Sequence, residues 1–169
     1  SKLPALAFYG IYQILILELN RYKECTLLPL GSHTASDRTS RSSGDIEITK
    51  KGKLFESVEV KLDKQIDINM ARIAYEKIVR FDPVRYYILS YIGISENDQK
   101  EINDLISTIK KEHGCQLIVN GLVPTLKYYL RLISDPVVFL NNYIKLVEKD
   151  TEIKPIHKTK LQELLKKYI

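Results

Sequence analysis

The sequence has little cysteine and no long apolar run, and each shortage excludes a class of protein. Its two cysteines, Cys25 and Cys115, stand alone without the spacing of a metal site, so we expect a reduced, cytoplasmic setting. The most apolar stretch, residues 3–19, is interrupted by polar side chains and is too broken to span a bilayer. It also lacks the basic start and small-residue cleavage site of a secretory signal, so no membrane segment is expected.

Several catalytic signatures are absent as well. The sequence contains no glycine-rich phosphate loop, no serine nucleophile elbow, no cysteine–histidine cluster and no internal repeat. With 169 residues, 44% of them hydrophobic and 28% charged, the chain is long enough for one globular domain. Its net charge of +5 permits a polyanionic partner without requiring one. Because it begins at Ser1 without an initiator methionine, we expect it to be part of a longer protein.

A predicted β-hairpin in the first half of the chain concentrates charged residues on one face. Residues 44–48 and 58–62 alternate polar and apolar side chains, and the basic segment 49–53 supplies the turn. Because successive side chains of a strand point to opposite faces, the apolar residues of both arms can share the buried face. Pairing of the arms then brings Asp45, Glu59 and Lys61 together on the polar face.

This combination of side chains has a chemical and a purely structural interpretation. Two carboxylates can hold a hard divalent cation through oxygen, and the cation with a lysine can polarise a water and a phosphodiester. Alternating strands also carry Glu-x-Lys on their solvent face as ordinary cross-strand ion pairs. The tripeptide Glu59-Val60-Lys61 alone therefore does not distinguish a nuclease from an exposed hairpin.

The order of elements around the tripeptide is more specific. An Asp followed about a dozen residues later by Glu-x-Lys on the adjacent strand resembles the PD-(D/E)XK nuclease superfamily, which includes most type II restriction endonucleases. Asp45 is the first acid here, and Gly44 replaces the proline that often precedes it. The wider frame, with Phe-Glu-Ser-Val-Glu-Val-Lys, Ala-Tyr-Glu-Lys and Arg-Tyr-Tyr-Ile-Leu-Ser, is similar to restriction enzymes of the SacI type. The resemblance covers roughly residues 5–120.

The resemblance implies a metal-dependent endonuclease. Its cofactor would be Mg²⁺, for which Mn²⁺ can substitute, held by Asp45, Glu59 and the backbone carbonyl of Val60. Lys61 would orient the attacking water, and the products would carry 5′-phosphates. Asp45, Glu59 and Lys61 are therefore the predicted catalytic residues, and Glu47, on the Asp45 face, is predicted to support them from outside the metal site.

Two further groups of residues have open assignments. In many members of the superfamily a glutamate from the first helix completes the metal site, and Glu18 is placed to do so. It could equally lie solvated at the edge of that helix or pair with Arg21. The polar loop 31–44 suits phosphate contacts, so DNA binding is predicted for His33, Arg38 and Arg41. His33 is better explained as a surface or phosphate-contacting residue than as a general base.

Periodicity and turn signals predict the remaining elements and an α/β fold with a mixed sheet. The expected order is a restriction-endonuclease-like αβββαβ core followed by extra C-terminal helices, with the strand at 85–92 parallel to a neighbour. The nuclease core is predicted over residues 1–121, with residues 122–169 packed on it as a helical extension. The expected elements are helices at 4–22, 67–80 and 95–113, strands at 26–30 and 116–120, and helices after residue 123.

Partners follow from the same resemblance. A type II restriction enzyme would bind double-stranded DNA, act as a homodimer on a palindrome, and belong to a system with a cognate DNA methyltransferase. Base readout is not assigned, although the loop 33–43 and the helices after Val123 are candidates. The alternative is a nuclease-like module that binds DNA or a partner without cutting, and a third hypothesis is an interaction domain that needs neither metal nor nucleic acid.

Overall fold

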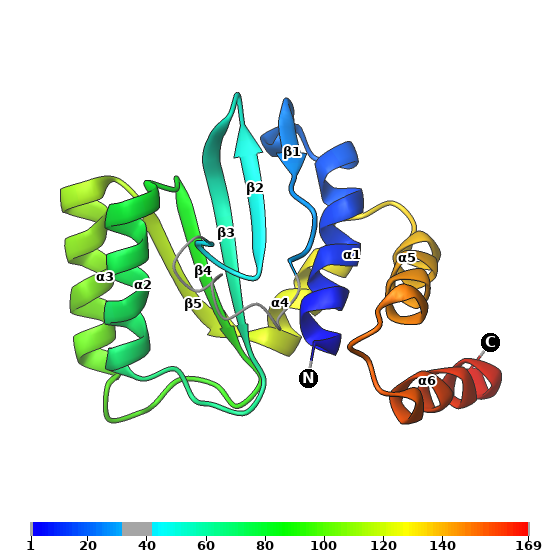
Figure 1. Cartoon of the computed structure of the whole chain (residues 1–169). Coiled ribbons are helices and arrows are strands. Elements are labelled where there is room, and N and C mark those ends of the chain that lie inside the picture. Colours follow the sequence, from blue (N-terminus) through cyan, green and yellow to red (C-terminus); the bar gives the residue numbers. More distant parts are fainter. Residues whose placement is uncertain (1, 32–41, 169) are drawn as a thin grey trace.

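The chain folds around one mixed five-stranded sheet, as the computed structural model in Figure 1 shows. The structure describes residues 2–31 and 42–168. The strands lie in chain order across the sheet. The pairs β1–β2 and β2–β3 are antiparallel, and the pairs β3–β4 and β4–β5 are parallel. Their bounds are β1 Cys25–Leu27, β2 Ile46–Lys50, β3 Lys53–Lys61, β4 Arg85–Ser90 and β5 Gln116–Gly121. The predicted α/β class with a mixed sheet is therefore confirmed.

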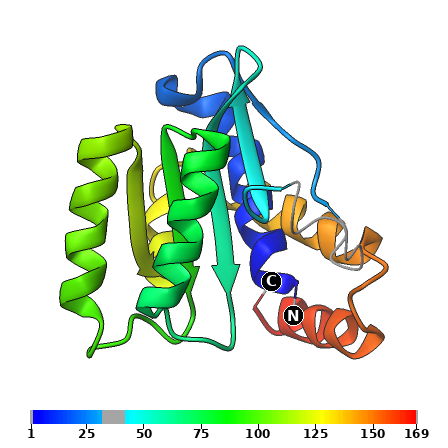
Figure 2. The same cartoon turned by 60° about the vertical axis from the view of Figure 1, so that its left-hand side comes forward.

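Helices cover both faces of the sheet. Two of them, α2 (Ile68–Phe81) and α3 (Gln99–His113), pack on one face over β4 and β5. The opposite face is covered by α1 (Leu3–Glu18) and α4 (Leu122–Leu130), and α5 (Pro136–Lys149) packs on the outer side of α1. The last helix, α6 (Pro155–Tyr168), packs beside α5 at the edge of the molecule, as the rotated view in Figure 2 also shows.

The element bounds differ from the predicted ones mainly at helix ends. The first helix stops at Glu18 and continues only as a short 3₁₀ turn, η1 (Asn20–Tyr22). The predicted N-cap of α2 is confirmed, because the Asp67 carboxylate accepts the Met70 N–H at 2.8 Å. Gly114 ends α3 with φ 69°, a left-handed conformation that glycine adopts without strain. Within residues 2–31 and 42–168, no helix combines the length and apolar content that crossing a bilayer requires.

The hairpin of β2 and β3 forms as the alternation predicted, with a tighter turn at Lys51 and Gly52. Ile46 and Val58 are paired and fully buried beneath α1. A register shift between Ile48 and Thr49 marks a bulge, which inserts one extra residue on β3 and strengthens the local twist. The crossover through α2 then returns the chain parallel to β3, as expected for a helix between parallel strands.

A buried carboxylate lies in the core beneath α1. Glu56 is wholly buried, and its Oε1 accepts hydrogen bonds from the hydroxyls of Tyr12 at 2.6 Å and Tyr22 at 2.9 Å. Burial and then the charge of Glu56 raise the pKa of both hydroxyls, so they remain protonated donors. The other oxygen lies 3.5 Å from Nη1 of Arg85, and within the described structure neither of these two atoms has a hydrogen-bond partner. The pair is held by charge in a dry environment.

This burial predicts an asymmetry between two arginine substitutions. Arg85→Met leaves the Glu56 carboxylate buried without its counter-charge, and we expect a loss of about 3–5 kcal/mol in the free energy of unfolding. Arg72→Met is the matched control, because Arg72 pairs with Glu101 at a similar 3.6 Å while both side chains are more than half exposed. We expect that variant to lose less than about 1 kcal/mol. Urea denaturation of both variants measures the difference, and equal losses would contradict a buried ion pair.

Candidate active site

The candidate site lies where the ladder between β2 and β3 ends. Asp45 directly precedes β2, and its backbone N–H donates to the Val58 carbonyl at 2.9 Å. Its carboxylate Oδ2 accepts the N–H of Val60 at 2.8 Å. Because the N–H and C=O of one strand residue point to the same side of the strand, the Val60 carbonyl is also directed toward the Asp45 edge of β3. A carboxylate and a carbonyl oxygen are therefore directed to the same edge.

Glu59 projects from β3 toward α2, on the face of the sheet opposite to α1. Its side chain is only 14% exposed, and both of its oxygens are engaged. Lys61 Nζ lies 2.6 Å from Oε1, while Oε2 accepts from Lys77 Nζ at 3.1 Å and from the Tyr86 hydroxyl at 2.8 Å. Lys61 shares the β3 face with Glu59, whereas Lys77 comes from α2 and Tyr86 from β4. Three elements thus converge on one carboxylate.

The charges around Glu59 keep it ionised. Burial alone would raise the pKa of its carboxyl group, but the ammonium groups of Lys61 and Lys77 and the hydrogen bonds from Lys61 and Tyr86 outweigh it. The pKa of Glu59 is therefore below its ordinary value. Burial and the nearby charge of Glu59 raise the pKa of Tyr86, with further contributions from Asp45 and Glu47, so its hydroxyl stays protonated.

A second hydrogen-bond network supports the segment before Asp45. Glu47 Oε1 accepts from the backbone N–H and the hydroxyl of Ser43, each at 2.7 Å, and Ser43 Oγ lies 2.8 Å from Ser57 Oγ. The Tyr86 hydroxyl lies 2.6 Å from the Ser43 carbonyl as well as 2.8 Å from Glu59 Oε2. Because a hydroxyl has one proton, it can donate fully to only one of these acceptors at a time. The hydrogen bonds from Ser43 to Glu47 therefore fix the backbone that leads into Asp45.

Gly44 fits tightly against β3. A Cβ atom at this position would lie 2.5 Å from Ser57 Oγ and 2.8 Å from the Val58 carbonyl oxygen. Both distances are shorter than real Cβ contacts, so the position before Asp45 requires glycine for a close backbone approach.

The structure brings together most of the residues predicted around the hairpin and adds two. Glu59 and Lys61 share one face of β3, and the N–H of Val60, between them, holds the Asp45 carboxylate. The two additional residues are Lys77, whose ammonium turns toward Glu59, and Tyr86. Lys77 follows Met70 by seven residues and Ile73 by four, and this helical spacing already indicates that the three share a face of the helix. The contact of Tyr86 with Glu59 depends instead on the register between β3 and β4.

The structure does not bring Glu18 to this site. Its Oε2 accepts from the backbone N–H of Ser134 at 2.7 Å and from the Ser134 hydroxyl at 3.0 Å. The physical reason is that α1 packs on the face of the sheet opposite to Glu59, and Glu18 ends this helix facing the segment between α4 and α5. Glu18 thus joins two helical segments, which corrects its predicted place among the metal ligands.

The predicted DNA contacts of the polar loop lie outside the described residues. His33, Arg38 and Arg41 all fall within residues 32–41. Their DNA-binding roles stay predictions.

The donor set at the site fits a hard cation. Asp45, Glu59 and the Val60 carbonyl supply oxygen atoms, which Mg²⁺ prefers over nitrogen or sulfur. Across the residues that the structure describes, no three His, Cys, Asp or Glu side chains form a group that could hold a metal. Mg²⁺ commonly takes one or two protein carboxylates and keeps several waters, so two carboxylates and a carbonyl are sufficient. A cation bound here would share the Glu59 carboxylate with the ammonium groups of Lys61 and Lys77.

The charge balance around Glu59 predicts a change in acid stability. A folded-state pKa below the unfolded value gives stability that is present above the ordinary carboxyl pKa and lost as pH falls through the folded pKa. Lys77→Met removes one ammonium and raises the pKa of Glu59, so the variant has less of this stability to lose. Between about pH 6 and about pH 3, we expect it to lose about 1 kcal/mol less than the unmodified chain, measured by urea unfolding. Lys77→Arg should behave like the unmodified chain, and equal losses in all three proteins would contradict the assigned role.

No family model matches the chain, and no curated protein matches it.

Proposed function

We propose that this chain is a Mg²⁺-dependent DNA endonuclease with a restriction-endonuclease-like core. The observation that carries the proposal is the position of Asp45 at the end of the β2–β3 ladder, where its carboxylate accepts the N–H of Val60, the residue between Glu59 and Lys61, with Lys61 Nζ 2.6 Å from Glu59. The element order through β4, helix followed by three strands, a helix and a strand, agrees with the αβββαβ pattern of that superfamily. Both features support phosphodiester hydrolysis.

The proposed metal ligands are Asp45, Glu59 and the carbonyl of Val60. When bound, Mg²⁺ would neutralise charge on the phosphate and acidify a water. Asp45 Oδ2 already accepts the Val60 N–H, and this bond holds the carboxylate at the edge where the Val60 carbonyl is directed. The residues are therefore oriented by the end of the strand ladder.

Two lysine side chains balance the negative charges of the phosphate and of Glu59. The Lys61 side chain is 31% exposed, and its ammonium can donate to a phosphate oxygen and to the attacking water. Lys77 keeps Glu59 ionised from the other side, and Tyr86 fixes the orientation of that carboxylate. Hydrolysis would add water across the bond between phosphorus and the 3′ oxygen, leaving a 5′-phosphate and a 3′-hydroxyl.

The proposal extends to double-stranded DNA as the substrate and to a homodimer that cuts both strands. A cognate methyltransferase in the same system belongs to this extension, which rests on the resemblance to type II restriction endonucleases.

A second candidate function is a nuclease-like module that binds DNA without cutting. One observation favours it: Glu59 has both oxygens occupied by ammonium and hydroxyl donors from its own chain. Such an arrangement satisfies the carboxylate without metal. Cleavage and binding must therefore be measured separately.

The endonuclease proposal predicts metal-dependent fragments from plasmid DNA. With mixed-sequence plasmid and Mg²⁺ or Mn²⁺, we expect discrete products with 5′-phosphates. Asp45→Asn and Lys61→Ala should each lower the cleavage rate at least about 10²-fold, because each removes a group that stabilises charge at the reacting phosphate. Arg72→Met is the control on an exposed charge away from Glu59 and should retain activity.

Metal binding supplies a readout that does not depend on cleavage. Titration calorimetry with Mn²⁺ should detect binding that Asp45→Asn weakens by about tenfold or more, while Arg72→Met leaves it unchanged. Absence of both cleavage and Mn²⁺ binding would refute the endonuclease. A gel shift on the same DNA would then separate the non-cutting module from a domain without nucleic-acid affinity.

A further inference from the structure

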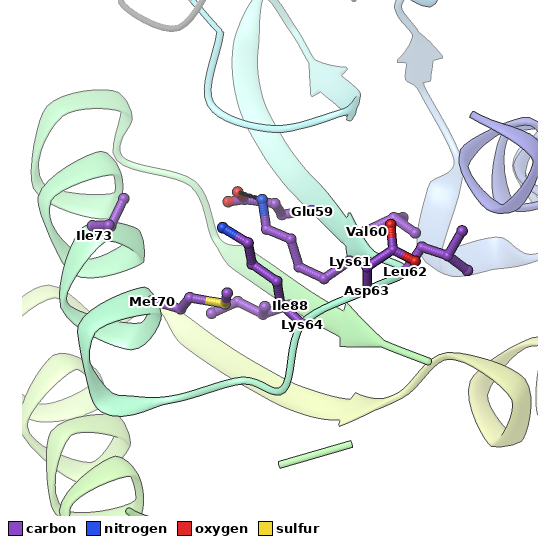
Figure 3. A pocket seen from close by; sticks show the side chains of 9 residues that line it. All are labelled: Glu59, Val60, Lys61, Leu62, Asp63, Lys64, Met70, Ile73 and Ile88. Atoms are coloured by element: carbon purple, nitrogen blue, oxygen red, sulfur yellow. Dashed lines mark ion pairs between the residues drawn. The ribbon is translucent and has the colours of Figure 1, made fainter. Parts of the chain in front are cut away.

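A pocket of about 390 Å³ opens directly beside the candidate catalytic residues. Glu59 and Lys61 belong to its lining, so the pocket is continuous with the site. It lies between the end of β3 with the following loop and the first turns of α2, as Figure 3 shows. A ligand bound in this pocket can therefore contact Lys61.

One wall of the pocket is apolar. Met70 and Ile73 project from α2 into it, and Ile88 of β4 lines its floor (Figure 3). Ile73 is 51% exposed because it lies away from the buried face of α2, which consists of Ala71, Ala74 and Ile78. Apolar surface left in water is unfavourable, so a ligand that covers Ile73 and Met70 gains free energy from their burial.

The other wall carries charges of both signs, because Lys61 and Lys64 line it together with Glu59 and Asp63. Lys61 and Lys64 extend side by side toward α2 in Figure 3, opposite Met70 and Ile73. Lys64 is exposed and lies three residues beyond Lys61, on the loop that leaves β3. Ammonium groups of this kind attract the phosphates of nucleic acid. The pocket thus offers an apolar surface facing lysines and carboxylates, and Lys64 is its exposed ammonium group.

The size of the pocket restricts its ligand. Small-molecule sites commonly measure about 300–1,000 Å³, so this one suits a ligand as small as a nucleoside. In a regular duplex the bases of a strand stay stacked about 3.4 Å apart and cannot enter a pocket singly. A base can enter only when it is unstacked, either in a single-stranded segment or by extrusion from the duplex.

We propose that this pocket binds the base and sugar of one unstacked nucleotide beside the phosphate that is hydrolysed. Met70 and Ile73 contact the base, and Lys64 contacts the phosphate that flanks the scissile one. The substrate class is then DNA that is unpaired, or becomes unpaired, at that nucleotide. This inference rests on the proposed nuclease function and specifies its substrate.

Binding to matched oligonucleotides tests the pocket. Asp45→Asn protein, which should not cleave, is titrated with a duplex and with the same duplex carrying one unpaired 2-aminopurine. We expect the unpaired DNA to bind about tenfold more tightly or better, and 2-aminopurine fluorescence to rise because an apolar wall does not stack on the base. Adding Ile73→Asp should remove both the preference and the rise.

The matched control is Val79→Asp on the same helix. Val79 is 55% exposed and is not part of the pocket lining, so this variant should keep the preference and the fluorescence rise. Ile73→Ser serves as a milder second variant, and thermal melts confirm that each protein is folded.

The outcomes separate the two proposals. If the chain cleaves plasmid but binds paired and unpaired DNA equally, or if Ile73→Asp and Val79→Asp behave alike, the nucleotide pocket is refuted and the nuclease stands. If the chain neither binds nor cleaves any of these DNAs, both proposals are refuted.

Discussion

The hydrogen bond from the Val60 N–H to the Asp45 carboxylate governs the arrangement of the site. A backbone donor at the end of a strand ladder needs a partner, and here a side chain takes the place that a further residue of β2 would fill. The acid is consequently fixed at the point where β2 begins. Glu59 and Lys61 flank Val60 on the same strand, so one bond sets the position of Asp45 relative to both. The fold has little freedom to separate these three residues.

Strand β3 carries one buried carboxylate, Glu56, and one partly buried carboxylate, Glu59, and their surroundings differ in a way that matters for function. Glu56 lies under α1 among tyrosine hydroxyls and Arg85, wholly away from solvent. Glu59 lies on the opposite face and opens to a pocket, with ammonium groups whose side chains are 31% and 23% exposed. The ammonium groups of Lys61 and Lys77 are point charges on flexible stems, whereas the planar guanidinium of Arg85 has a fixed geometry, so the lysines can exchange partners more easily. Glu59 is therefore suited to chemistry, and Glu56 to structure.

Alternation along the strands was sufficient to predict which residues of the hairpin share a face. Ile46 and Val58 define the buried side, and the acidic and basic residues of the site follow from that parity. Contacts between different strands and helices could not be predicted from this alternation. Tyr86 reaches Glu59 because β3 and β4 adopt one of several possible parallel registers, and Lys77 does so because α2 has a particular rotation over the sheet. Local periodicity determines neither the strand register nor the rotation of the helix. It also does not determine which face of the sheet a helix covers, and this is why Glu18 of α1 was predicted at the wrong place.

The close approach of Gly44 to β3 has a consequence for how this hairpin can vary. Any side chain at this position would meet the Ser57 hydroxyl and the Val58 carbonyl, so the proline often found before the first acid does not fit this backbone. Ser57 is itself already small and holds Ser43 through a hydroxyl contact. The two positions therefore constrain each other, and a larger residue at 44 would demand glycine at 57 together with a new path for the preceding loop. Residues 44 and 57 should be treated as one coupled unit in any redesign of this hairpin.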